Sequence, residues 1–232
     1  MQSYKLIFDL QNSLLLLQPF MVSCVYDWTN TYYMTEKKEK IGLYFGSFNP
    51  IHVGHLILAS YIVQNSDLKK IWFVVSPQNP LKKQSSLADN NTRYHLVQLA
   101  VEDNPLFEVS NVEFSLPLPS YTINTLNFLS NKYPNKEFAI LMGEDNLVTI
   151  DKWKDYQLIL QNYPIYVYPR KEEEKTTIKT SFKDYNINVV DAPLINISAS
   201  YIRSLIRQGK SIQYFVTDKV YKEIEKSNLY RQ

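Results

Sequence analysis

Two histidines and two glycines share one short stretch of the chain, GSFNPIHVGH, from Gly46 to His55. The apolar run Ile41–Phe45 precedes it and an apolar pattern with helical spacing follows it, so we expect a buried strand, a loop and a helix that begins near Val53. Glycine lets a backbone approach a bulky anion closely, and a helix start attracts negative charge through its N–H groups and dipole. The arrangement therefore favours the binding of a triphosphate.

His52 and His55 are three positions apart, which places both imidazoles on one side of the first helical turn. A metal site would need further ligands, and His95, the only other histidine, has no neighbours that resemble a ligand set. We therefore predict no protein metal site. The alternative is a loop with two chance histidines, one of which caps the helix.

A second candidate anion site is the segment ISASYIR, Ile197–Arg203. Ser198 or Ser200 can cap the helix that follows, and Arg203 lies within one turn of that start. A hydroxyl, backbone N–H groups and a guanidinium would converge there on an anion. The alternative is an ordinary Ser-capped helix with a surface arginine.

Strand and helix patterns alternate from Ile41 onward. Short apolar strands between helices predict a parallel sheet covered on both faces, with ligands beyond the carboxyl ends of the strands. Gly46, Pro77 and Gly143 each follow a predicted strand, as such a site requires. We expect strands at 41–45, 71–75, 107–114, 137–142, 165–168 and 187–190, and helices at 53–65, 92–102, 122–131, 153–161, 200–208 and 217–227.

GSFNPIHVGH resembles the HxGH signature of the nucleotidyltransferase superfamily, which implies an α/β, Rossmann-like, doubly wound parallel sheet. The segment from Ile197 to Arg203 resembles the ISSTxIR motif, which grips the β- and γ-phosphates. Ala199 and Ser200 depart mildly from it, and Ser200 keeps a hydroxyl where Thr is usual. Asn49 stands where Asp is more usual and preserves a turn-forming side chain without the charge.

Three further segments resemble bacterial nicotinate-nucleotide adenylyltransferases. Gly143-Glu144-Asp145 with Trp153 looks like their GxD…W stretch, Pro119–Thr125 like PSYTxDT with Asn124 for Asp, and Pro77–Lys82 like their Pro-rich loop. Seen alone, Trp153 is equally a core residue and Asp145 equally a helix cap. The resemblance implies that Trp153 stacks on a pyridine ring, which needs a flat π-face.

The resemblance runs from about Ile41 to Leu229 and implies two sets of contacts. Contacts to ATP would come from Gly46, Ser47, Phe48, His52, His55, Gly143, Asp145, Arg170, Ile197, Ser198 and Arg203, with His52, His55 and Arg203 catalytic. Contacts to the mononucleotide would come from Gln78, Asn79, Lys82, Tyr121, Thr122 and Trp153.

The activity implied is transfer of the adenylyl group of ATP to nicotinate mononucleotide, giving nicotinate adenine dinucleotide and pyrophosphate in NAD biosynthesis. Mg²⁺ would be held mainly by the ATP phosphates, because the motifs offer few carboxylates. Nicotinamide mononucleotide, phosphopantetheine and glycerol phosphate remain alternative acceptors, although phosphopantetheine enzymes usually have Thr in place of His52. A non-catalytic nucleotide sensor is a further alternative, against which the intact His52, His55, Ser198 and Arg203 argue.

Composition limits the other partners. The 232 residues are 45% hydrophobic and 21% charged, enough for one α/β domain with a full core. The net charge of +2 does not argue for nucleic acid or an anionic membrane. Cys24 is the only cysteine, so no internal disulfide is possible, which fits the cytoplasm. The sequence leaves the oligomeric state open, a homo-oligomer included.

The first 33 residues differ from the rest. Their apolar run Leu14–Leu17 is too short to span a bilayer, and a secretory signal would need a basic start and an unbroken apolar centre. Our hypothesis is that Met34 is the natural start, that 1–33 are a disordered or artefactual extension, and that 34–232 form the nucleotidyltransferase domain. We expect mass spectrometry of the native protein to find a chain that begins at Met34, and peptides from 1–33 would reject this.

Overall fold

The computed structural model describes residues 23–26, 32–35, 38–78, 87–169 and 182–231. The chain divides into two units, Met1–Lys38 and Glu39–Gln232. In the first unit, β1 (Ser23–Tyr26) and β2 (Tyr32–Thr35) pair antiparallel, which the sequence did not lead us to expect. The hypotheses that residues 1–33 lack a fold of their own and that Met34 is the natural start stay predictions.

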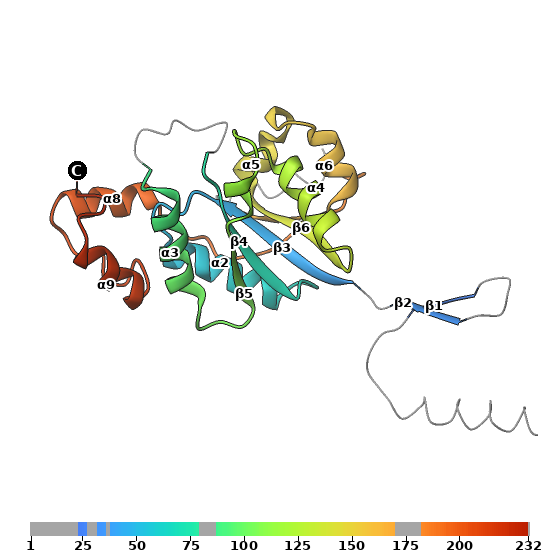
Figure 1. The fold of residues 1–232 in the computed structure, drawn as a ribbon, viewed down its shortest axis with the longest axis horizontal. Helices are drawn as coiled ribbons and strands as arrows, with labels where there is room; N and C mark the ends of the chain where they lie inside the picture. The colour runs from blue at the N-terminus through green and yellow to red at the C-terminus, as the bar shows by residue number, and fades with distance from the viewer. Residues whose placement is uncertain (1–22, 27–31, 36–37, 79–86, 170–181, 232) are drawn as a thin grey trace, which may run out of the picture. The chain divides into compact units, whose positions relative to one another are not determined.

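A six-stranded parallel sheet forms the centre of the second unit (Figure 1). Its strands stand in the order β5–β4–β3–β6–β7–β8. Their bounds are β3 Glu39–Gly46, β4 Lys70–Val75, β5 Phe107–Ser110, β6 Lys136–Gly143, β7 Ile165–Tyr168 and β8 Ile187–Val189. The chain builds β3, β4 and β5 outward on one side and then returns to place β6 beside β3. The strand order therefore reverses between β3 and β6, the position at which such sheets bind ligands.

Helices cover both faces of this sheet because alternate strand residues point to opposite sides and both sets are apolar. Tyr44 and Phe73 pack toward one face and Leu43 and Val74 toward the other. The first face carries α2 (Val53–Gln64), α3 (Asn90–Val101), α8 (Ala199–Arg207) and α9 (Asp218–Lys226), and the second carries α4 (Thr122–Lys132), α5 (Glu144–Val148) and α6 (Tyr156–Asn162). The predicted doubly wound α/β fold is confirmed. Within the described ranges, no helix is long and apolar enough to cross a membrane.

Two predicted elements were wrong in extent. The strand expected at 107–114 ends at Ser110, and the 3₁₀ helix η1 (Val112–Ser115) follows it, which turns Glu113 inward toward α4. The helix expected at 153–161 begins only at Tyr156, because Asp155 has a left-handed backbone with φ 52°. Trp153 instead follows a second short 3₁₀ helix, η2 (Ile150–Lys152).

Arg93 of α3 is a fully buried cation that ties the ends of two strands together, with 0% of its surface exposed. Its guanidinium donates to the carbonyl of Ser47 just after β3, to that of Ser76 just after β4 (2.9 Å), and to that of Ala88 before α3 (3.0 Å). A fourth bond goes to Oδ1 of Asn90 at 2.6 Å. Burial lowers the pKa of Arg93, and these acceptors satisfy its donors.

We expect Arg93→Ala to lower the free energy of unfolding by about 3 kcal/mol, because it leaves three backbone carbonyls without their donor. Denaturant unfolding followed by circular dichroism measures the change. The control is Arg207→Ala, which removes an exposed arginine and should change stability by less than about 0.5 kcal/mol. Equal effects of the two substitutions would contradict the structural role given to Arg93.

Candidate active site

His52 and His55 form a stacked pair at the start of α2. His52 is the residue before the helix, and its backbone N–H donates to Nδ1 of His55 at 3.3 Å. The two ring centroids lie 3.7 Å apart with 28° between the planes, so the predicted placement on one side of the first turn is confirmed. Because Nδ1 of His55 accepts a hydrogen bond, the ring proton sits on Nε2 as a donor. The pair is therefore arranged to donate rather than to hold a metal from both rings.

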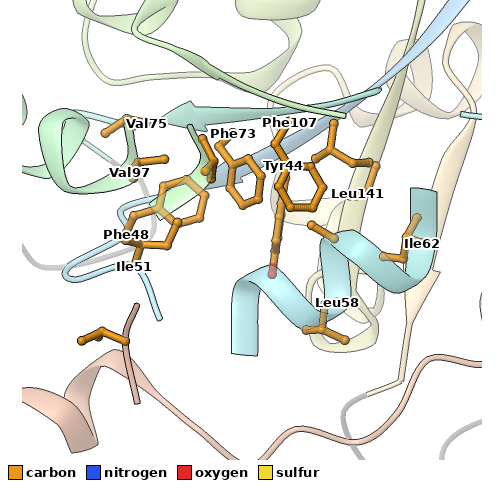
Figure 2. Packing of buried hydrophobic residues seen from close by; sticks show 14 of the residues in the cluster. Tyr44, Phe48, Ile51, Leu58, Ile62, Phe73, Val75, Val97, Phe107 and Leu141 are labelled. Carbon is orange, nitrogen blue, oxygen red and sulfur yellow. The ribbon is translucent and has the colours of Figure 1, made fainter. Parts of the chain in front are cut away.

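An aromatic cluster fixes the orientation of the His55 ring. The ring of Phe48 meets it edge to face at 5.1 Å and that of Tyr44 at 5.9 Å. Tyr44 is held in turn by Phe73, at 5.7 Å, and by a hydrogen bond between its hydroxyl and that of Tyr168 at 3.1 Å. Figure 2 shows Tyr44 and Phe73 between the sheet and α2. This packing pre-organises the imidazole before any ligand binds.

The glycines of the signature make room for protein side chains. A Cβ on Gly46 would lie 2.7 Å from the ring of Phe48, which folds back over the strand end with a left-handed φ of 43°. A Cβ on Gly54 would lie 2.9 Å from Ile195 and 3.0 Å from the ring of His52. We expected these glycines to let the backbone approach an anion closely. The structure adds a packing reason, since a larger residue at either position would displace the ring beside it.

The helix start offers fewer open N–H groups than the sequence suggested. The N–H of Val53, the first residue of α2, donates to the carbonyl of Phe215 at 2.9 Å. The N–H of His55 lies 3.0 Å from the carbonyl of His52. The imidazoles therefore carry more of any phosphate binding here than the helix backbone does.

Arg203 joins the second candidate anion site to the first. Its Nη1 donates to the carbonyl of Asn49 at 2.8 Å, and its Nη2 lies 3.4 Å from Oγ of Ser200. Ser198 caps α8, since its Oγ accepts from the N–H of Tyr201 at 3.2 Å. Burial lowers the pKa of Arg203, but a guanidinium remains charged at neutral pH. A positive charge and a capped helix start thus lie beside the signature loop.

The residues proposed for the mononucleotide come from segments that contact one another. The N–H of Ser120 donates to the carbonyl of Gln78 at 3.1 Å, which joins the loop after β4 to the segment before α4. Lys154, the residue after Trp153, places its ammonium 4.9 Å from the centre of the Tyr121 ring. Trp153 is half-buried against the second face of the sheet, so it is not a fully enclosed core residue.

Some of the remaining predicted site residues are described by the structure and others lie outside the described ranges. Gly143 is the residue that caps α5. Asp145 is exposed in the first turn of that helix, so it is not the helix cap that was its alternative role. Thr122 opens α4 directly after Tyr121. Ile197 is half-buried one residue before the cap of α8, and Ser47 is half-buried with its carbonyl bonded to Arg93. Asn79, Lys82 and Arg170 lie outside the described residues.

Three charged residues among those described are buried, Arg93, Glu113 and Glu144, and the sequence predicted none of these burials. Arg93 did leave a signal, because it precedes Leu96 and Val97 by three and four positions on the apolar face of α3. A charged residue on such a face is rarely buried without a specific set of partners. Glu113 left no comparable signal. Among the described residues, no group of three His, Cys, Asp or Glu side chains is placed to hold a metal ion.

Comparison with known proteins finds similar sequences. The family model described as cytidylyltransferase-like matches residues 43–205. A protein named "Probable nicotinate-nucleotide adenylyltransferase" from Flavobacterium psychrophilum is 50% identical over 194 residues, 83% of this chain and 100% of the relative. One of the same name from Flavobacterium johnsoniae is 49% identical over 193 residues, again 83% of this chain and 100% of the relative.

A solved structure shares the fold. It is the nicotinic acid mononucleotide adenylyltransferase of Plasmodium falciparum complexed with NaAD, with a TM-score of 0.69 and 19% identity over 83% of this chain and 97% of that one. At that identity the likeness speaks for the fold alone. The identity to the two bacterial relatives over their whole length goes further, and this chain belongs to the nicotinate-nucleotide adenylyltransferase family.

Proposed function

We propose that this chain transfers the adenylyl group of ATP to the 5′-phosphate of nicotinate mononucleotide, a step in NAD biosynthesis. The products are nicotinate adenine dinucleotide and pyrophosphate. The observation that carries the proposal is the stacked pair His52–His55 at the carboxyl end of β3, with Arg203 bonded to the same loop. The printed names of the bacterial relatives support the same activity.

The reaction places modest demands on the protein. A 5′-phosphate oxygen of the mononucleotide attacks the α-phosphorus of ATP in line, a new P–O bond forms, and the bond to the β-phosphate oxygen breaks. A phosphate monoester has lost most of its protons at neutral pH, so it needs no strong base. Catalysis then depends on positioning and on stabilising the charge that develops on the phosphoryl oxygens.

The histidine pair is suited to stabilise the charge that develops on the phosphoryl oxygens. Nε2–H of His55 is a donor whose direction is set by Phe48 and Tyr44, so it is aligned before charge develops on a phosphate oxygen. His52 is 6% exposed and stacked on His55, which limits the movement of both rings. Fixed donors of this kind stabilise a transition state without reorganising during the reaction.

We propose that Arg203 and Ser198 bind the leaving group, pyrophosphate. Arg203 uses Nη1 on the carbonyl of Asn49, which fixes its guanidinium beside the signature loop while leaving other N–H groups for phosphate oxygens. Ser198 lies at the start of the same helix, where N–H groups and the helix dipole favour an anion. We assign the pyrophosphate to this position.

The side chains that the site offers also indicate how a Mg²⁺ ion would be held. The described site residues offer imidazoles, a guanidinium and hydroxyls rather than a carboxylate cluster, which fits a Mg²⁺ ion held by ATP phosphates and water. When bound, the ion would neutralise part of the triphosphate charge. Asp145, exposed in the first turn of α5, is the carboxylate we propose to face the ATP side.

The direct test is pyrophosphate release with ATP and either nicotinate or nicotinamide mononucleotide in parallel. We expect turnover with the nicotinate form at a clearly higher kcat/KM. Isothermal titration with ATP accompanies the assay, since ATP binding without pyrophosphate release from either acceptor would identify a nucleotide sensor instead.

We expect His55→Ala to lower kcat about 10²–10³-fold, because it removes a donor to the developing charge. The control is His95→Ala, which truncates an exposed histidine of α3 and should leave kcat unchanged. Circular dichroism checks that both variants are folded. A folded His55→Ala variant with near-normal turnover would count against the role proposed for this imidazole.

We expect Trp153→Ala to raise KM for nicotinate mononucleotide on the order of tenfold, as loss of an aromatic stacking partner does elsewhere. KM for ATP should stay close to its original value. Trp153→Phe keeps a flat ring and should recover most of the affinity. An unchanged KM for the mononucleotide in the alanine variant would rule out the stacking contact.

A further inference from the structure

Glu113 is a buried carboxyl on the side of β4 opposite to Arg93. It is 2% exposed and lies in η1, between β5 and α4. Oγ1 of Thr125 donates to its Oε1 at 2.8 Å. No ion pair reaches it within the part of the chain that the structure describes. Its other oxygen, Oε2, is buried with no hydrogen-bond partner among the described residues.

Three hydroxyls surround this carboxyl. Burial raises the pKa of Glu113, and the hydroxyls of Ser76, Thr125 and Ser120 nearby oppose that rise. Thr125 is the one that hydrogen-bonds to it, whereas Oγ of Ser120 is buried without a hydrogen-bond partner among the described residues. Ser76 directly follows β4, Ser120 directly precedes Tyr121, and Thr125 stands in the first turns of α4. Glu113 therefore lies where the loop after β4, the segment before α4 and α4 itself meet.

Each of these segments bears a residue proposed to contact the mononucleotide. Gln78 lies two residues after Ser76, and its carbonyl accepts from the N–H of Ser120 at 3.1 Å. Tyr121 and Thr122 lie between Ser120 and Thr125. A shift of any one hydroxyl would therefore move a proposed contact residue.

Burying a carboxyl without a cation costs stability, so Glu113 is a poor choice for holding the fold together. Its useful property is that two oxygens can accept from several donors at once and so fix their directions. We therefore expect Glu113 to fix the geometry of its neighbours rather than to stabilise the fold.

We propose that Glu113 is a positioning residue for the mononucleotide half of the site, which holds the start of α4, and with it Tyr121 and Thr122, through the hydroxyl of Thr125. It has no contact with the reacting atoms. The inference rests on the proposed function, since it takes nicotinate mononucleotide as the ligand of these residues.

The experiment compares Glu113→Gln with Glu108→Gln in the full chain. Gln keeps the shape of Glu113 but replaces the carboxyl with a neutral amide, whose oxygen is a weaker acceptor for the hydroxyl of Thr125 than a charged carboxylate oxygen. Glu108 lies five residues earlier, half-exposed and paired with Lys70, so it serves as the matched control. Steady-state kinetics give KM for each substrate, and isothermal titration gives Kd for nicotinate mononucleotide alone.

We expect Glu113→Gln to raise KM and Kd for nicotinate mononucleotide about tenfold, the size usual for lost hydrogen bonds to a charged group. KM for ATP should change less than about twofold. Thr125→Val, which removes only the donor to Oε1, should move the same two constants in the same direction. Glu108→Gln should change none of them.

Two results would overturn the inference. Equal increases of KM for both substrates, or a lowered thermal midpoint with unchanged kinetics, would give Glu113 a purely structural role. If Glu113→Gln does not fold, Thr125→Val decides in the same way. Failure of the proposed function is distinct, because the unsubstituted chain would then release no pyrophosphate with nicotinate mononucleotide, and the inference would end with it.

Discussion

The buried guanidinium of Arg93 is the interaction on which the site depends. It bonds to carbonyls that follow β3 and β4 and to one that precedes α3, so a single side chain fixes the loop after β3 and both ends of the connection between β4 and α3. Lysine could not do this, because one ammonium cannot reach three acceptors in the plane of a guanidinium fork. Once the loop at Ser47 is fixed, Phe48 can fold over Gly46 and support the ring of His55.

The end of β4 joins the two halves of the site. Ser76 receives Arg93 on its carbonyl, its hydroxyl opposes the raised pKa of Glu113, and its N–H bonds to the carbonyl of Gly46 at 2.9 Å. The cation thus acts from the α2–α3 face of the sheet and the carboxyl from the α4 face. The signature loop and the segment before α4 are therefore both positioned relative to Ser76. This favours the correct spacing between a triphosphate and a mononucleotide.

The sequence was informative where a local pattern decides the structure. Alternation of short apolar strands and helices predicted the sheet, and the spacing of His52 and His55 predicted that both rings lie on one side of the first helical turn. It failed where partners are distant in sequence. The strand pattern continued to Phe114, yet the chain turns at Val112 into η1, where Glu113 bonds to Thr125, a contact that no local period encodes. Arg93 is similar, since it also bonds to Ser47, which lies 46 residues away in the chain.

Asn49 illustrates how a departure from the usual signature can leave the geometry intact. Its side chain is 2% exposed, and its Oδ1 accepts from the N–H of Ala88 at 3.1 Å, a bond that a carboxylate oxygen could make equally well. The contact to Arg203, in contrast, uses the main-chain carbonyl of Asn49 and so does not depend on the side chain. The backbone path of the loop, rather than the charge at this position, is therefore what keeps Arg203 beside the histidine pair.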